Sequence, residues 1–291
     1  MLVIMDKPKH PQTALKRALA LQDATAARVE AVSFCWHPMA AALDVLEVEQ
    51  RRAIRDALLK KRKAWLRQCV DDAQGGKAGG EITRKAVWTD DIAGWTTRAV
   101  EKRGIDLVVK SVHYSRTLLH TPLDWQLLRS CTAPVLLTSA RRRKTAKVVL
   151  AALDLSRLDR AHQHLNGMVL ASAQAFAERT GAELHCAYVI ELSEVLRDLD
   201  VIDARQARKK AVATVSEALE GLVAPYGIAK SRRHFPIGKV GQSLQFLASK
   251  LKAELLVVGT AAHPIRQTLG IGNSAERVLS RAACDVLAVR P

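Results

Sequence analysis

The feature of this chain that most constrains its fold is an internal repeat. Three short apolar runs in the first half recur in the same order in the second half. The matched runs are 2–6 with 149–154, 106–109 with 254–257, and 134–137 with 285–288, at separations of 148, 148 and 151 residues. Three matches in near-constant register indicate a duplication. A duplicated chain of 291 residues predicts two domains of about 145 residues each.

The boundary between the two copies is predicted at a charged run, RRRKT at 141–145. This run lies between the last apolar run of the first copy and the first apolar run of the second. We therefore expect one domain over 1–143 and another over 144–291. The connection is short, about five residues, so the two domains are expected to lie close together in one chain.

Each copy alternates short apolar runs with longer amphipathic segments, which predicts strands and helices in turn. Expected strands lie near 2–5, 28–35, 81–88, 106–110 and 134–138, then 147–153, 182–190, 230–235, 254–258 and 285–290; expected helices lie near 12–25, 45–73, 90–103 and 122–131, then 160–180, 202–223, 240–252 and 273–282. Near-continuous apolar runs are typical of parallel strands that are buried on both faces. The order predicts an α/β fold with two tandem doubly wound parallel sheets.

Ligands of such sheets bind at the carboxyl ends of the strands, where the strand order reverses. Asp6, Lys110, Asp154 and Gly259 each follow an expected strand directly, which places all four at that edge. After Gly259 comes a loop rich in small residues, and Gly272-Asn273-Ser274 leads into the last helix. A glycine turn before a helix N-terminus presents free N–H groups to an anion, most often a phosphate.

The stretch 254–291 resembles the C-terminal signature of the universal stress protein family. In that family, Gly-x2-Gly-x9-Gly-(Ser/Thr) follows a strand and wraps a nucleotide triphosphate. Gly259 and Gly272 occupy the first and last glycine positions, whereas Ala262 replaces the middle glycine and Asn273 replaces the Ser or Thr. The segment TPLDWQLLRSCTAPVLL at 121–137 resembles the tandem-domain branch of the family, and the resemblance covers essentially the whole chain.

The resemblance implies a ligand site in the second domain and pairing of domains through their last strands. Here the two copies could pair within one chain as a pseudo-dimer. The candidate ligand-binding residues are Asp154, Gly259, Arg266, Gly272, Asn273 and Ser274. The resemblance places Asp154 near the ribose or base, and ATP or another phosphate-bearing ligand is the cofactor that it implies.

A structural role for the same glycines stays open. Gly259 could serve only to turn the chain, and Asn273, with Glu276 three residues later, forms a capping box. The Ala262 methyl group would occupy phosphate space, and the Glu276 carboxylate would compete with an anion. We therefore expect weak or absent nucleotide binding in the second domain.

The first domain is expected to lack a phosphate site. Lys110 aligns with Gly259, Thr121 with Gly272 and Pro122 with Asn273. Proline has no N–H to donate, so 121–124 predicts an ordinary helix start. Lys110 is expected to reach solvent, with an acidic ligand as the alternative.

The chain is strongly basic, with a net charge of +16, to which 1–143 contributes +10 and 144–291 contributes +6. Eight cations lie on the expected helix at 45–73: Arg51, Arg52, Arg55, Lys60, Lys61, Arg62, Lys63 and Arg67. They could form an ordinary solvated face, or a surface for nucleic acid or acidic lipid. Trp65 is the lone aromatic residue of that helix, which gives no aromatic interleaving of the kind used to stack bases.

No catalytic or metal-binding pattern is present in the sequence. The nine histidines are scattered, and His162 and His164 would face apart on a helix. The five cysteines have no metal spacing and are expected to be reduced and packed. No apolar run is long enough for a membrane span, and the first residues predict a strand rather than a signal peptide. We expect a cytoplasmic, non-enzymatic stress-response binding protein; a weakly ATP-hydrolysing protein and a charge-driven polyanion binder are the alternatives.

Overall fold

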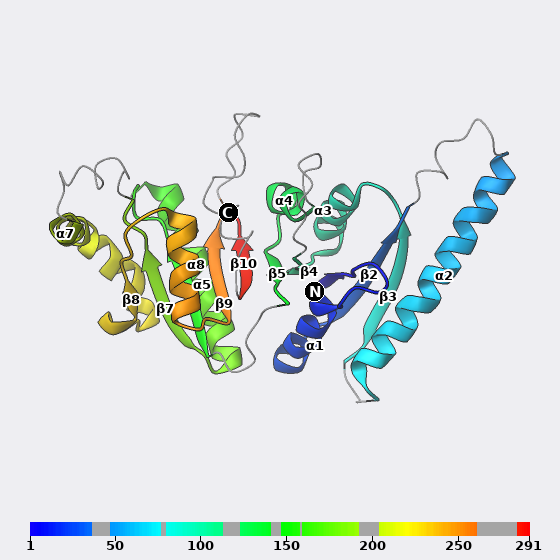
Figure 1. The fold of residues 1–291 in the computed structure, drawn as a ribbon, viewed down its shortest axis with the longest axis horizontal. Coiled ribbons are helices and arrows are strands. Elements are labelled where there is room, and N and C mark those ends of the chain that lie inside the picture. Colours follow the sequence, from blue (N-terminus) through cyan, green and yellow to red (C-terminus); the bar gives the residue numbers. More distant parts are fainter. Residues whose placement is uncertain are drawn as a thin grey trace. The chain divides into compact units, whose positions relative to one another are not determined.

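The structure, a computed structural model, describes residues 1–36, 47–76, 80–112, 123–140, 147–157, 159–191, 204–260 and 284–291 (Figure 1). The chain divides into two compact units, Met1–Ala140 and Arg141–Pro291. Each unit is an α/β structure in which five strands pair in parallel. The fold class expected from the sequence, tandem parallel-sheet domains, is therefore confirmed.

The first unit contains a five-stranded parallel sheet. Its elements are β1 (Leu2–Ile4), α1 (Thr13–Thr25), β2 (Val29–Cys35), α2 (Val48–Gln74), β3 (Ile82–Trp88), α3 (Ile92–Arg103), β4 (Val108–Ser111), α4 (Leu123–Ser130) and β5 (Val135–Thr138). The strands lie in the order β3-β2-β1-β4-β5. The order reverses between β1 and β4, which is where a doubly wound sheet opens a crevice.

Burial explains why these segments form central strands and covering helices. All residues of β1, β4 and β5 are buried, so both faces of these strands are covered. In the doubly wound topology, α1 and α2 pack together on one face and α3 packs on α4 on the other. Helix α3 begins at a true cap, because the Asp91 carboxylate accepts a hydrogen bond from the Gly94 N–H at 2.7 Å.

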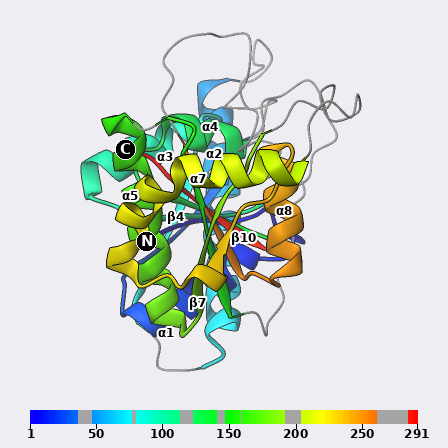
Figure 2. The same cartoon turned by 90° about the vertical axis from the view of Figure 1, so that its left-hand side faces the viewer.

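The second unit repeats the same plan. Its elements are β6 (Val148–Leu153), α5 (Arg160–Thr180), β7 (Glu183–Tyr188), α7 (Ala204–Val223), η2 (Ala224–Tyr226), η3 (Lys230–Arg232), β8 (Arg233–His234), α8 (Val240–Lys250), β9 (Leu255–Gly259) and β10 (Asp285–Val289). The strand order is β8-β7-β6-β9-β10, again parallel. Figures 1 and 2 show α5 and α8 on opposite sides of these strands. The reversal between β6 and β9 brings Asp154 and Gly259 to the same edge.

One expected element differs in the structure, and another lies outside the described residues. The strand expected over 230–235 is only two residues long, because Lys230–Arg232 forms a 3-10 turn at the edge of the sheet. The helix expected over 273–282 lies outside the described residues. Over the described ranges, no helix is long and apolar enough to cross a membrane.

All five cysteines are free thiols in the structure. Cys35, Cys131, Cys186 and Cys284 are buried, while Cys69 on α2 is half-buried. Burial raises the pKa of Cys186 to about 11 and that of Cys284 to about 12. Such thiols stay protonated and pack as small apolar side chains, as the sequence predicted.

Candidate ligand-binding site

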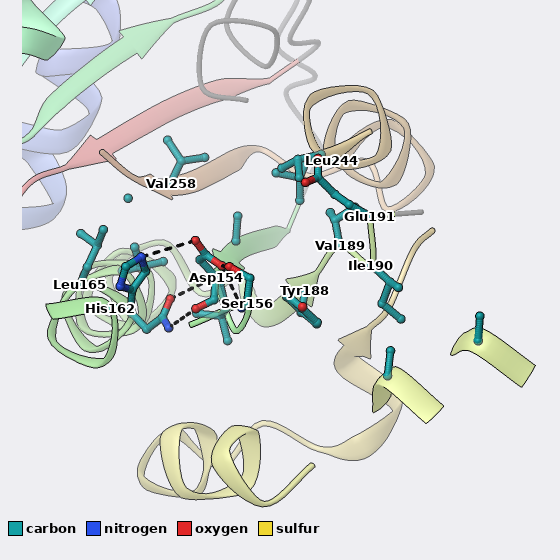
Figure 3. Close-up of a pocket in the computed structure, with 18 residues that line it drawn as sticks. Asp154, Ser156, His162, Leu165, Tyr188, Val189, Ile190, Glu191, Leu244 and Val258 are labelled. Carbon is teal, nitrogen blue, oxygen red and sulfur yellow. Dashed lines mark hydrogen bonds and ion pairs between the residues drawn. The ribbon is translucent and has the colours of Figure 1, made fainter. Parts of the chain in front are cut away.

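A pocket of about 570 Å³ opens at the carboxyl edge of the second sheet (Figure 3). The ends of β6, β7 and β9 form one side, and α5, α7 and α8 contribute the rest. The pocket is lined by residues 152–154, 156, 162, 165, 166, 169, 188–191, 207, 211, 240, 244, 258 and 259. Its volume falls within the range of sites for small organic ligands. Asp154 and Gly259, two of the residues expected from the sequence, both line it.

The backbone of Asp154, at the mouth of this pocket, is fixed by two hydrogen bonds to the Asn166 side chain. The Asp154 N–H donates to Asn166 Oδ1 at 2.9 Å, and Asn166 Nδ2 donates to the Asp154 carbonyl at 2.8 Å. Asn166 lies on α5 and is buried, so the helix fixes the turn that follows β6. The Asp154 side chain nevertheless remains 57% exposed. The carboxylate is therefore fixed in position and accessible to a ligand.

Ser156 and His162 flank the Asp154 carboxylate, as Figure 3 shows. Asp154 Oδ1 accepts hydrogen bonds from the Ser156 N–H at 3.0 Å and from Ser156 Oγ at 2.5 Å. His162 Nε2 lies 4.0 Å from Asp154 Oδ2. The acid therefore stands between the hydroxyl and the imidazole. This order does not give a serine activated by a histidine.

The other nitrogen of His162 is bound to the start of its own helix. Asp159 caps α5 by accepting from the His162 N–H at 3.0 Å, and its Oδ1 lies 2.7 Å from His162 Nδ1. The hydrogen bonds from His162 hold the pKa of the Asp159 carboxyl below its usual range. The cap fixes the imidazole orientation, with Nε2 directed to the pocket side.

The remaining described lining is mostly apolar. Aliphatic side chains, among them Val189, Ile190 and Leu244, make up much of this lining. Tyr188 lies beside them, and its pKa is raised by burial and by the nearby carboxylates of Asp154 and Glu191. This part of the pocket combines an apolar slot with carboxylate acceptors. Such a lining suits a flat ring with hydroxyl groups better than a phosphate.

Gly259 has a packing reason to be glycine. A Cβ atom at this position would lie 2.7 Å from Leu165 Cγ and 2.8 Å from Leu165 Cδ2. The Leu165 side chain of α5 therefore packs against Gly259 and would have to shift to admit a Cβ atom. This contact favours glycine at position 259 whether or not a phosphate binds.

The first unit fills the equivalent edge with a buried ion pair. The strand registers make Lys110 the counterpart of Val258 rather than of Gly259, as the sequence alignment had it. Lys110 was also expected to reach solvent, and that prediction is wrong. Its ammonium lies 2.5 Å from Asp124 Oδ1 and also donates to the Ser111 carbonyl at 2.8 Å. Both side chains are less than 10% exposed. The buried ammonium of Lys110 is stabilised because Asp124, in the first turn of α4, supplies a countercharge.

Four of the expected ligand residues, Arg266, Gly272, Asn273 and Ser274, lie outside the described residues, as do Thr121 and Pro122. Sequence reasoning missed His162, Leu165, Asn166 and Tyr188 as lining residues. The spacing of His162 and Asn166, one helical turn apart, was the available signal, because it places both on the same face of α5. That this face of α5 lies next to Asp154 is a consequence of the tertiary fold and cannot be read from the spacing.

The sequence model of the Usp family, the universal stress protein family, matches residues 1–139 and 147–290. This chain belongs to the universal stress protein family. It carries two copies of the family domain, and stress response is the role associated with the family. Usp proteins are generally regarded as non-enzymatic.

Similarity to curated relatives extends over the full chain. Universal stress protein E of Escherichia coli strain K12 is 26% identical over 100% of this chain and 93% of the relative. A homologue of that protein from Haemophilus influenzae is 24% identical over 100% and 96%. These tandem Usp relatives indicate a UspE-like protein. The single-domain universal stress protein A homolog 1 of Coxiella burnetii is 33% identical over 49% of this chain and 95% of the relative.

Two solved structures share the fold of this chain. A protein of unknown function from Pseudomonas aeruginosa PAO1 has a TM-score of 0.70 at 24% identity, covering 100% of this chain and 92% of its own. A universal stress protein from Archaeoglobus fulgidus has a TM-score of 0.66 at 14% identity, covering 99% and 96%. At these identities the likeness supports the tandem architecture.

Proposed function

We propose that this chain is a cytoplasmic stress-response protein that binds a nucleotide-like, phosphate-bearing ligand through its second domain, over 144–291, without turning it over. The observation that carries this proposal is the pocket of about 570 Å³ with the exposed Asp154 carboxylate at its mouth. In this proposal the ligand acts as a signal that the protein senses.

The apolar wall and the carboxylates would hold the uncharged end of such a ligand. A base could lie against Val189, Ile190 and Leu244, and ribose hydroxyls could donate to Asp154. The phosphates would be bound by the segment that contains Gly272, Asn273 and Ser274, with Arg266 as a countercharge. Ala262 and Asn273 depart from the family pattern, so the proposed binding is weak.

Binding without catalysis is favoured by the order of the polar groups. Ser156 donates to Asp154 rather than to His162, so the site lacks an activated hydroxyl among the described residues. A ligand that enters the pocket therefore meets the Asp154 carboxylate, which can accept hydrogen bonds from its hydroxyl groups. Hydrolysis would need another group to activate water.

The proposal assigns ligand binding to the second domain and a structural role to the first, over 1–143. Asp6 corresponds to Asp154 in the repeat, yet Asp6 is buried whereas Asp154 is exposed. Lys110 and Asp124 neutralise each other where the second unit has its pocket edge. A nucleotide would have to break this pair to enter the first unit.

Isothermal titration of magnesium-ATP into the full chain tests this assignment. We expect a dissociation constant weaker than about 10 µM. Asp154→Asn should weaken it at least about fivefold, because an amide is a poorer acceptor for a hydroxyl than a carboxylate. Asp90→Asn, an exposed acid in the first unit, serves as the matched control and should leave binding unchanged. Low-micromolar binding would refute the expected weakness, and equal binding by both variants would refute the proposed site.

A further inference from the structure

A second, smaller cavity lies in the first unit between the start of α2 and the end of β3. Its volume is about 170 Å³, and it is lined by Val48, Arg51, Arg52, Arg55 and Trp88. Three of the five lining residues are arginines, and the fifth offers an indole ring. The cavity is too small for a whole nucleotide but can accommodate a single phosphate group.

Helical periodicity explains how arginines come to line this cavity. Arg55 precedes Leu66 by eleven residues, which is three turns, so both lie on the same stripe of α2. At the C-terminal half of the helix this stripe is apolar, and Leu66 and Val70 are buried against the rest of the unit. Figure 1 shows α2 diverging from β3 toward the N-terminus of the helix. The sheet-facing stripe is therefore cationic where α2 leaves the sheet.

Most of the cations on this part of α2 have no acidic partner among the described residues. Across the described ranges, the Arg52 and Arg55 side chains form no ion pair, and neither do Lys60, Lys61, Lys63 and Arg67. At the other end of the same helix, Asp71 pairs with Arg84 at 2.5 Å. The acids near the first turns are Glu47, Glu49 and Asp56. Eight cations from Arg51 to Arg67 thus outnumber the acids along about 24 Å of helix.

The site is formed by side chains rather than by the helix terminus. Glu47 caps α2 and accepts from the backbone N–H at the third helical position, while Gln50 accepts from the Glu47 N–H at 3.1 Å. This capping box uses donors that would otherwise bind an anion. An anion at this end of α2 must therefore be held by the guanidinium groups. Arginine binds phosphate oxygens in a bidentate manner.

Trp88 on β3 supplies an aromatic ring beside these arginines, which the sequence of the helix alone did not indicate. The residue ends β3, pairs with Cys35 in the sheet register, and is half-buried beside the arginines. A positive groove with an aromatic platform is the combination used to bind single-stranded nucleic acid, because cations follow the backbone and rings stack on unpaired bases. A membrane surface fits less well, since only Val48 and Ile54, at 57% and 39% exposed, are large apolar residues exposed on this helix.

We propose that α2 and the end of β3 form a binding surface for single-stranded nucleic acid. One backbone phosphate lies between Arg51, Arg52 and Arg55, an adjacent base stacks on Trp88, and the following phosphates lie along the cations as far as Arg67. This surface lies in the first unit and does not depend on the ligand pocket of the second unit. No covalent step is involved.

Fluorescence anisotropy with a labelled 20-nucleotide oligothymidine tests the surface on the full chain. Wild-type protein should bind with an affinity that falls steeply between 50 and 200 mM salt. The double variant Arg52→Gln/Arg55→Gln should bind at least about tenfold more weakly, and its slope of log K against log salt should be shallower by about 1.4, the value for two single-strand phosphate contacts. Both side chains are exposed, so the variant should fold.

Two further variants separate this site from general electrostatics. Lys209→Gln/Lys210→Gln removes the same charge from an exposed part of α7 and should change affinity less than twofold. Trp88→Leu should weaken binding severalfold with an unchanged salt slope, because it removes stacking only. The proposal is wrong if wild-type protein does not bind the oligonucleotide at 50 mM salt, or if the α7 control loses as much affinity as the α2 double variant. Co-sedimentation with phosphatidylglycerol vesicles tests the lipid alternative: the proposal is also wrong if the α2 double variant binds the vesicles more weakly but binds the oligonucleotide as wild type does.

Discussion

At the scale of single residues, the Lys110–Asp124 pair shows why a strand-end lysine cannot be placed from sequence. The partner acid lies fourteen residues further along the chain, on the next helix, and only the fold brings the two groups within 2.5 Å. Sequence alone shows a charged group at a strand end, which usually reaches solvent. Buried charges persist only when they are paired, and this pairing is tertiary.

Removing one member of this pair should destabilise the first unit strongly. Lys110→Met or Asp124→Leu leaves an uncompensated buried charge, which costs about 3–5 kcal/mol. The double variant should recover most of that loss, because both charges are gone. Urea unfolding followed by circular dichroism measures all three. A loss below about 1 kcal/mol in both single variants would show that the pair is solvated in solution.

The His185–His234 contact predicts a pH dependence of stability. His185 Nδ1 lies 2.9 Å from His234 Nε2. Burial lowers the pKa of both imidazoles; for His234 the charges of His185 and Lys250 lower it further, whereas Glu183 partly offsets the shift at His185. The unfolded chain, with histidine pKa values near 6.5, therefore binds more protons than the native state just below that pH.

The consequence is that the contribution of this pair to stability is complete above about pH 7 and is lost as pH falls through 6.5 toward the folded pKa values. His234→Gln keeps a hydrogen-bonding group near the Nε2 position and removes the titration, so the free energy of unfolding should depend less steeply on pH. His164→Gln, at an exposed position on α5, is the control and should behave as wild type. An unchanged pH slope in His234→Gln would exclude the pair as its source.

At the scale of elements, strands and helices were largely predictable and the site was only partly so. Apolar runs such as 255–258 gave central strands because both faces of a parallel sheet are buried. The length of the edge strand β8 was overestimated, because the preceding residues, Lys230–Arg232, form a 3-10 turn. Asp154 and Gly259 were found from their place after strands, whereas Asn166 reaches the site from a helix face that spacing alone does not assign.

The contact between α5 and β9 should be sensitive to a single methyl group. Gly259→Ala places a Cβ atom against Leu165, which should cost about 1–3 kcal/mol through overpacking. Leu165→Ala in the same chain makes room, so the two changes should be less than additive in a double-mutant cycle. Thermal unfolding of the four proteins provides the test. Strict additivity would mean that α5 moves away freely.

At the scale of the whole molecule, the pairing of the two domains within one chain stays a prediction from sequence. Each copy ends in an apolar strand, and such edges are normally paired or covered. The short linker at 141–145 keeps the partner at high effective concentration. Small-angle scattering should give one compact peak in the distance distribution, independent of concentration. Two separated maxima would indicate independently moving domains instead.

The central claim is that the second unit, and not the first, contains the small-ligand site. Photoaffinity labelling of the full chain with 8-azido-ATP, followed by peptide mapping, tests this most directly because it reports location even when binding is weak. We predict that ATP-competable labelling falls on peptides within 152–191 and 240–259, which contain Asp154, Tyr188 and Gly259, and decreases in Asp154→Asn. Competable labelling confined to peptides within 1–140 would contradict the account.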